Sequence, residues 1–330
     1  MNAIAMGTGE DGADSVGGTH PCPRGVWPVM LTPFLGDRAI DWTGVDALVE
    51  MYLEAGVAGL FAVAQSAEMF QLTEDERVML AARVVERVAG RVPVVAAGAF
   101  GPTPERQAAM VRRLSATGVA AVVLLTNQLA DDGEGDEVWR ARAAALLAAT
   151  DGVDLGLYEC PAPYKRILPA ETLGWAAATG RFVFHKDTCL VGAQIAAKIA
   201  AVRGTRLRFF NAEMASLLDS LEAGGDGFAG IAANYYPEVV VWLCRHALDR
   251  PGDARRIHDL LTVGEQVVDF KYPAAAKRFL RLSGRLAIAD ACRVHAVGFS
   301  EHDDRGLRAL DRLTVALVPE PEVAVEVPAP

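Results

Sequence analysis

The 330-residue sequence lacks the patterns that mark metal, redox, nucleotide and membrane proteins. Its five cysteines form no CxxC pair and its six histidines form no HxH or HExxH pattern, so neither a zinc motif nor a disulfide framework is predicted. No GxGxxG or GxxxxGKS/T loop is present to bind a nucleotide. No apolar run reaches the roughly 20 residues of a membrane helix, and the net charge of −10 argues against nucleic acid or an anionic membrane as partner.

The two ends of the chain lack the long apolar segments from which a hydrophobic core is built. Residues 1–23 are rich in Gly and Asp and lack both a basic start and an apolar segment, so a disordered tail is expected rather than a signal peptide. Residues 318–330 contain proline too often for a helix and are expected to form a second disordered tail. Scattered, unpaired cysteines suit a reducing compartment, and we expect a soluble cytoplasmic protein.

Between these tails, short apolar runs alternate with amphipathic segments. Asp41, Thr73 and Thr103 each stand where a helix cap is expected, with capping-box spacing after Thr73 and a proline after Thr103. The apolar runs are nearly continuous, which is typical of parallel strands covered by helices. The predicted strands are Val26–Thr32, Gly59–Val63, Val92–Gly98, Ala120–Thr126, Leu155–Cys160, Phe182–Lys186, Leu207–Asn211 and Phe228–Ala232.

Eight strands that are each followed by a helix predict a (β/α)8 TIM barrel, which we assign to residues 24–250. Residues 251–317 contain helical segments with no strand between them and are predicted to form a C-terminal helical extension. Lys271 and Lys277 are expected on the solvated face of these helices. In such a barrel the chemistry collects at the C-terminal ends of the strands.

Lys186 lies at that end of the sixth predicted strand, after aromatic and β-branched residues. An amine held in a dry pocket loses preference for its charged form and becomes a nucleophile toward carbonyl groups. The alternative is a purely structural ion pair with Asp187 or another buried carboxylate. Tyr158 occupies the matching end of the fifth strand, where a phenol can move protons during imine formation. His185 should face the surrounding helices, because neighbouring strand residues point to opposite sides, and we interpret it as structural.

Five segments, in order along residues 25–317, resemble the class I pyruvate-dependent lyases, a family that includes dihydrodipicolinate synthase and N-acetylneuraminate lyase. Each motif alone is weak, but their order and spacing together make the resemblance specific. The matching segments are Leu31–Phe34 for T-P-F, Ala64–Glu68 for the G-T/S-T/S-G-E loop, Leu157–Pro161 for Y-N-x-P, Phe184–Asp187 for G-I-K-D/E and Gly224–Gly227 for G-G-x-G.

This resemblance implies roles for particular residues. Lys186 would form an imine with a 2-oxo acid, most simply pyruvate, with no cofactor other than this covalent imine. Tyr158 would relay protons to and from the substrate, and Ser66 would hold its carboxylate together with nearby backbone N–H groups. Glu68 would anchor the loop by hydrogen bonds. Family members are commonly tetramers, so a homotetramer or homodimer is expected.

The sequence also departs from the family pattern. Ala64 and Ala67 replace the two loop glycines, and their methyl groups would crowd a backbone that approaches a carboxylate. Gln65, which we place at the substrate, replaces the hydroxyl residue that links the tyrosine relay. A second relay tyrosine is missing from Thr126–Leu129, and the aldehyde-binding arginine is missing from its place after Pro161. Dihydrodipicolinate synthase activity itself is therefore not expected.

Other polar residues are candidates for a rebuilt second-substrate pocket. Glu213 aligns with a segment that binds polyol hydroxyls in sugar-acid lyases, although an acidic residue also suits the first turn of a helix. Asn234 follows the eighth strand and is either a substrate ligand or an oligomer contact. Tyr164 and Arg166 follow the fifth strand, where they either hold a carboxylate or phosphate or belong to a solvated loop.

The sequence therefore predicts a Schiff-base-forming lyase that makes or breaks a carbon–carbon bond in pyruvate or a related 2-oxo acid, with an aldehyde as a candidate second substrate. A protonated imine withdraws electrons and stabilises the enamine that forms when a bond or proton is lost. Two alternatives stay open at this point. One is a dehydratase of a sugar-derived 2-oxo acid, and the other is a barrel that binds or regulates without turnover.

Overall fold

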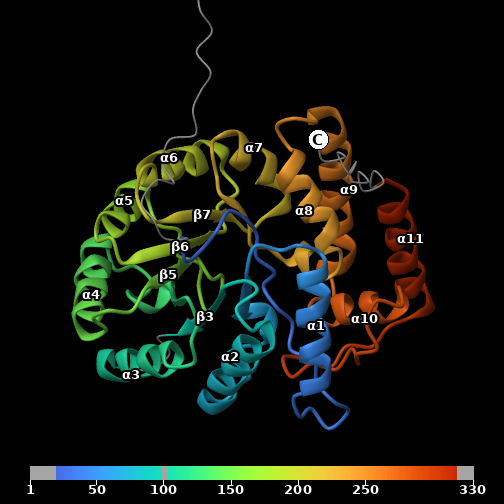
Figure 1. Ribbon diagram of the computed structural model, residues 1–330, viewed down its shortest axis with the longest axis horizontal. Coiled ribbons are helices and arrows are strands. Elements are labelled where there is room, and N and C mark those ends of the chain that lie inside the picture. Colours follow the sequence, from blue (N-terminus) through green and yellow to red (C-terminus); the bar gives the residue numbers. More distant parts are fainter. Residues whose placement is uncertain (1–19, 99–100, 102, 318–330) are drawn as a thin grey trace, which may run out of the picture.

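The computed structural model describes residues 20–98, 101 and 103–317. Eight parallel strands form one sheet in the order β1-β8-β7-β6-β5-β4-β3-β2. The sheet closes between its edges, because the Phe61 N–H donates to Pro28 O and the Met30 N–H donates to Phe61 O, both at 3.0 Å. Helices surround this sheet and a further group lies to one side (Figure 1). The predicted TIM barrel with a C-terminal helical extension is confirmed.

The first and eighth strands are much shorter than predicted from the sequence, whereas the ends of the other strands lie within two residues of their predicted positions. The strand β1 has two residues because Pro28, which has no N–H to donate, interrupts it soon after Val26. The strand β8 also has two residues, and a 3-10 turn from Ile231 to Asn234 takes the place of its expected end. The strands are β1 Gly25–Val26, β2 Leu60–Val63, β3 Val94–Gly98, β4 Ala121–Leu125, β5 Leu155–Tyr158, β6 Phe182–Asp187, β7 Arg208–Asn211 and β8 Gly227–Phe228.

Three helices of the barrel begin at the caps predicted for them. Asp41 accepts the Gly44 N–H, Thr73 forms a complete capping box with Glu76, and Thr103 accepts the Arg106 N–H. The barrel helices are α1 Trp42–Glu54, α2 Glu74–Val88, α3 Pro104–Ser115, α4 Asp136–Ala149, α5 Ala170–Ala178, α6 Gly192–Val202, α7 Leu217–Glu222 and α8 Pro237–His246. Those of the extension are α9 Pro251–Asp269, α10 Ala274–Leu282 and α11 Glu301–Leu317.

Aromatic rings fill the interior of the barrel. Phe184 stacks on Phe210 with 4.7 Å between ring centroids, and Trp27 and Phe61 meet the Phe184 ring at 5.3 and 5.8 Å. Phe184 and Lys186 are two residues apart on β6 and therefore share its inner face. The apolar layer consequently lies directly below Lys186 and excludes water from that side.

The C-terminal extension is tied to the barrel by a buried ion pair. Lys277 of α10 is fully buried, and its Nζ lies 2.9 Å from Oε1 of Glu68. The prediction that Lys277 is solvated was wrong, because the loop that follows β2 places a carboxylate against α10. Lys271 is partly exposed and donates to Asp303 at 2.8 Å.

The expected tails fall mostly outside the described residues, which exclude 1–19 and 318–330. The last four residues assigned to the first tail pack against the barrel. Cys22 is fully buried, and Nε2 of His20 lies 2.8 Å from Arg206 O. Among the described residues, no helix is both long and apolar enough to span a membrane.

Candidate active site

A cavity of about 580 Å³ opens at the C-terminal ends of the strands. The barrel contributes the residues on which the sequence analysis concentrated: Gln65, Ser66, Tyr158, Lys186 and Glu213. The extension contributes another wall, formed by Glu265 and Asp269 of α9 and by Tyr272, which precedes α10. The structure thus brings five of the eight predicted site residues together and adds three that the sequence analysis did not identify.

Lys186 and Tyr158 stand opposite each other in the register of β6 and β5. The Lys186 Nζ lies 4.6 Å from the centroid of the Tyr158 ring, and only 5% of the lysine is exposed. Burial lowers the pKa of Lys186 to about 8, although Glu213, Cys160 and Glu265 act in the opposite direction. The alternative ion pair with Asp187 is not formed, since the Asp187 carboxylate is bound by Lys198 at 2.6 Å.

The loop after β2 forms a short 3-10 turn, η1, from Gln65 to Ala67. Oε1 of Gln65 accepts a hydrogen bond from the Tyr158 hydroxyl at 3.2 Å. Ala64 and Ala67 are buried in the hydrophobic core, so their methyl groups add to the packing of the loop. Glu68 anchors the loop, as its Oε2 accepts the backbone N–H groups of Arg293 and Val294 in addition to the Lys277 ion pair.

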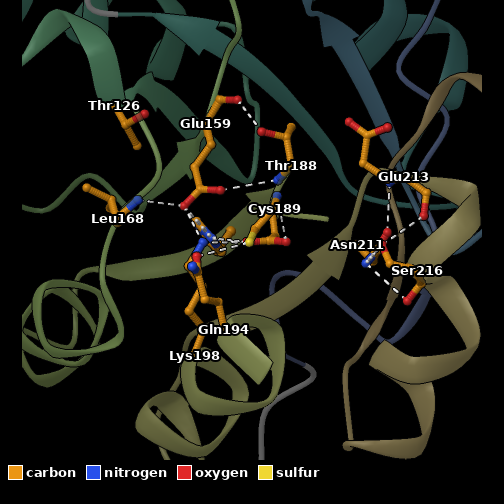
Figure 2. A network of polar contacts seen from close by, with 12 residues as sticks. Thr126, Glu159, Leu168, Thr188, Cys189, Gln194, Lys198, Asn211, Glu213 and Ser216 are labelled. Atoms are coloured by element: carbon orange, nitrogen blue, oxygen red, sulfur yellow. Dashed lines mark hydrogen bonds and ion pairs between the residues drawn. The ribbon is translucent and has the colours of Figure 1, made fainter. Parts of the chain in front are cut away.

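Acidic side chains also line the cavity. Glu213 follows β7, where Oδ1 of Asn211 accepts its backbone N–H at 2.7 Å (Figure 2), and burial raises the pKa of its carboxyl. Burial also raises the pKa of Glu265 to about 8, with Glu213 and Asp269 adding to the effect. The buried Oε1 of Glu265 has no hydrogen-bond partner among the described residues. Glu265 is therefore largely a neutral carboxylic acid at pH 7 and can donate a proton.

Tyr164 and Arg166 do not line this cavity. The Tyr164 hydroxyl donates to Ala130 O, and Arg166 donates to Glu134 O and to Asp136 at the start of α4. Both residues therefore hold the loop after β5 against its neighbour. Lys165, which lies between them in the sequence, does line the cavity, where its Nζ donates to Thr188 O at 2.7 Å.

Asn234 lies one layer below the cavity rather than on its surface. Its Nδ2 donates to Val29 O and to the Tyr272 hydroxyl, and its Oδ1 accepts from the Tyr52 hydroxyl. Tyr235 also lies below the cavity and packs with its neighbour against Phe279. Asn234 consequently contacts cavity residues and not the cavity itself.

On the outer face of the same strands lies a buried charged network, shown in Figure 2. The Lys198 Nζ of α6 lies 2.6 Å from Oε1 of Glu159 and 2.6 Å from Oδ1 of Asp187. Oε1 of Glu159 also accepts the Leu168 N–H, and its Oε2 accepts the Thr188 N–H. These bonds tie the ends of β5 and β6 together behind Tyr158 and Lys186.

His185 completes this outer network and faces the helix layer. Its Nε2 lies 3.7 Å from Oε1 of Glu159 and 3.8 Å from Oδ1 of Asp187. These three residues have the composition and spacing of a metal-binding set. The Lys198 ammonium already lies between the two carboxylates and supplies the positive charge that a metal ion would bring. We interpret the set as a structural ion cluster.

Sequence reasoning missed Glu265, Asp269 and Tyr272 because they belong to the extension. In the sequence, residues 253–268 show only the pattern of an amphipathic helix, and its position relative to the barrel depends on contacts between distant segments. One feature of the sequence could have indicated that this part of the extension packs against the barrel. Lys277 lies in a run of mostly apolar residues that follows Tyr272. A lysine in an alanine-rich apolar segment indicates a buried partner.

A closed parallel barrel with a buried amine and a phenol at its C-terminal mouth defines a class of protein, the (β/α)8 enzymes equipped to attack carbonyl groups. Within that class, the chain belongs to the dihydrodipicolinate synthetase family, whose sequence model matches residues 22–295. It is therefore a lyase of the class I, pyruvate-dependent aldolase type.

Individual relatives are similar to the chain at low identity. The 4-hydroxy-tetrahydrodipicolinate synthase of Laribacter hongkongensis is 28% identical over 242 residues, or 70% of this chain and 78% of the relative. A solved monomeric dihydrodipicolinate synthase variant has a TM-score of 0.81 at 25% identity, covering 91% of this chain and 100% of that one. A prophage protein of the family from E. coli K12, solved with pyruvate, has a TM-score of 0.78 at 23% identity, covering 89% and 98%; at this identity the likeness shows the shared fold.

Proposed function

We propose that this lyase binds pyruvate or a related 2-oxo acid as an imine on Lys186. The observation that carries the proposal is a buried amine that faces a cavity, has its pKa lowered to about 8 and forms no ion pair with a carboxylate of the described residues. A useful fraction of this amine is uncharged at neutral pH and can attack the 2-oxo carbon. Tyr158 stands beside it and exchanges protons with the carbinolamine oxygen.

The second half of the reaction uses a pocket unlike that of a dihydrodipicolinate synthase. The cavity lining includes Lys165 and His295 but, among the described residues, no arginine to grip an aldehyde's carboxylate. The acidic residues Glu213 and Asp269 face the same space and offer no positive charge to a second anionic group. We therefore assign carbon–carbon bond making or breaking with an aldehyde that lacks a carboxylate.

Dehydration of a sugar-derived 2-oxo acid is the second candidate. Glu265 favours it, because a buried carboxylic acid with a pKa of about 8 holds a proton at pH 7 and can give it to a departing hydroxyl. An enamine on Lys186 is common to both reactions. The two candidates differ in the second molecule, which is an aldehyde released or consumed in the first and water released in the second.

The enamine itself provides the test. Pyruvate incubated with the enzyme in D₂O should exchange its methyl protons for deuterium, which proton NMR measures, because imine formation acidifies those protons. Lys186→Ala should abolish the exchange, while Lys165→Ala, a second cavity lysine, should retain exchange. Equal exchange by the wild type and Lys186→Ala would refute the assignment. Pyruvate binding without exchange by the wild type would favour the binding or regulatory alternative.

A further inference from the structure

A chain of hydrogen bonds runs from the core to the cavity and ends at Ser66. The Tyr52 hydroxyl donates to Oδ1 of Asn234 at 2.8 Å, and Nδ2 of Asn234 lies 2.6 Å from the Tyr272 oxygen. The Tyr272 hydroxyl lies 2.7 Å from Oγ of Ser66, which lines the cavity together with Lys186. Tyr52, Asn234, Tyr272 and Ser66 are thus connected by consecutive hydrogen bonds, and Tyr272 is the member that comes from the C-terminal extension.

The direction of these hydrogen bonds is fixed at Asn234. Its amide nitrogen also lies 2.9 Å from Val29 O, and a carbonyl oxygen can only accept, so the group facing Val29 and Tyr272 is the NH₂. The Tyr272 oxygen must then accept from Asn234 and give its single proton to Ser66. The Ser66 oxygen in turn accepts from Tyr272, which leaves its own proton for another acceptor. No described residue takes that proton.

The hydrogen bond at Tyr158 has a different character. Oε1 of Gln65 accepts the Tyr158 proton, and an amide oxygen has no proton to pass on. The connection from Tyr158 therefore ends at Gln65. In contrast, the chain through Tyr272 delivers a hydrogen-bond donor to the cavity, and each bond strengthens the next because all point the same way.

We propose that Tyr272 is a positioning residue that presets the Ser66 hydroxyl as a donor to the carboxylate of the bound 2-oxo acid. This inference rests on the proposed function, because it takes a 2-oxo acid as the ligand. A serine hydroxyl rotates freely and can point its proton at any nearby acceptor. Because the Tyr272 proton already occupies the hydrogen bond between the two hydroxyls, Ser66 does not donate to Tyr272 and its own proton is left for the cavity. The carboxylate then meets a donor that needs no reorientation upon binding.

Pyruvate affinity measured by titration calorimetry tests the inference. Tyr272→Phe keeps the ring and removes the proton that orients Ser66, so the dissociation constant should rise roughly tenfold, an ordinary effect of weakening one charge-assisted hydrogen bond. Tyr235→Phe, which changes a buried tyrosine outside the chain of hydrogen bonds, should leave the affinity unchanged. Unchanged affinity in Tyr272→Phe would overturn the inference.

A double-mutant cycle shows whether Tyr272 acts through Ser66. In a Ser66→Ala background the Tyr272→Phe change should have no further effect on the dissociation constant. An equal tenfold loss in both backgrounds would overturn the inference, since it would indicate a merely structural role. Borohydride trapping of the same samples reports the imine separately. Pyruvate binding without any adduct in the wild type would refute the proposed function. The double-mutant cycle would still decide whether Tyr272 acts through Ser66.

Discussion

At the scale of single residues, the reactivity of Lys186 follows from its surroundings. The aromatic layer around Phe184 keeps water away from below, while Glu213 and Glu265 stand within electrostatic range across the cavity. Burial favours the neutral amine and the acids favour the ammonium; burial is the larger effect, so the pKa falls to about 8. Lys186 can therefore act as a nucleophile when neutral. After imine formation, the protonated imine on Lys186 carries a positive charge near Glu213 and Glu265.

The pH dependence of imine formation should follow this pKa. The rate of borohydride-trapped adduct formation with pyruvate should rise as the pH approaches 8 and level off above it, because only the neutral amine attacks. Glu213→Gln removes the largest influence that raises the pKa of Lys186, so the midpoint should move to lower pH. Asp151→Asn, at a side chain that is 98% exposed, should not move it. A midpoint near the ordinary lysine value of 10.5 would contradict the account.

The lowered pKa of Lys186 also makes the folded protein more stable as the pH rises. Between about pH 8 and 10.5 the unfolded chain holds a proton on Lys186 that the folded chain has lost. Since the unfolded state then binds more protons, the free energy of unfolding gains a contribution that rises with pH over this window. Urea unfolding at several pH values measures this contribution as the unfolding free energy of the wild type minus that of Lys186→Met. This difference should rise between about pH 8 and 10.5, and a difference that falls would contradict the prediction.

At the scale of the elements, the reactive ends of β5 and β6 are held from outside the barrel. Burial alone would lower the pKa of Lys198, but the Glu159 and Asp187 carboxylates outweigh it and raise this pKa. The ammonium is therefore charged and compensates two buried carboxylates. The family motif Y-N-x-P has asparagine where this chain has Glu159, so this chain depends on Lys198 of α6 for compensation.

Removing Lys198 should be strongly destabilising. Lys198→Met leaves Glu159 and Asp187 facing each other without a cation, which should cost about 3–5 kcal/mol of unfolding free energy. Adding Glu159→Gln should restore part of the loss, because one of the two charges is removed. Arg305→Met, at an exposed pair with Glu301, should cost no more than about 1 kcal/mol. Urea unfolding measures all three, and equal losses in Lys198→Met and Arg305→Met would exclude the compensating role.

The sequence predicted the elements where local signals were strong. The caps at Asp41 and Thr73 and the five strands from β3 to β7 are where they were expected, because side-chain capping and apolar runs are local properties. The expected end of the eighth strand was wrong. The strand pairs with its neighbours only as far as Phe228, and a 3-10 turn from Ile231 to Asn234 follows; the continuous apolar run gives no local signal of where the pairing stops.

The same distinction explains the site. Residues at strand ends, such as Lys186 and Glu213, were predicted to lie at the mouth because the barrel dictates where strands end. Of the two alternatives for Tyr164 and Arg166, a place at the substrate cavity is not what the structure has, since both side chains bond to neighbouring loop and helix residues instead. Tyr272 was missed because only the packing of the extension brings it to Ser66.

At the scale of the whole molecule, the extension completes the cavity and is fastened through Lys277. Replacement of Lys277 by Met should leave Glu68 buried without its partner and release the loop that contains Ser66. We expect faster amide hydrogen exchange at Arg293 and Val294, whose N–H groups bind Glu68. Lys271→Met, at a partly exposed pair, is the matched control. Equal amide hydrogen exchange in Lys277→Met and Lys271→Met would argue against the role of the Lys277–Glu68 ion pair in holding the extension on the barrel.

The oligomeric state belongs to the same scale. Large apolar side chains are exposed at Leu190 and Val191 before α6 and at Phe270 after α9, which is 82% exposed. Such exposure favours association, and we expect a homodimer or homotetramer. Light scattering should give two or four times the chain mass of 35.1 kDa. A mass equal to one chain would refute the expectation and align this protein with the monomeric variant that it resembles.

Imine formation on Lys186 can be detected directly by borohydride reduction in the presence of pyruvate, followed by intact mass and peptide mapping. We expect one adduct of pyruvate size per chain, located on Lys186 and absent from Lys186→Ala. An adduct formed only with longer 2-oxo acids would keep the chemistry and change the donor substrate. An adduct on another lysine, or none with any 2-oxo acid, would contradict the account.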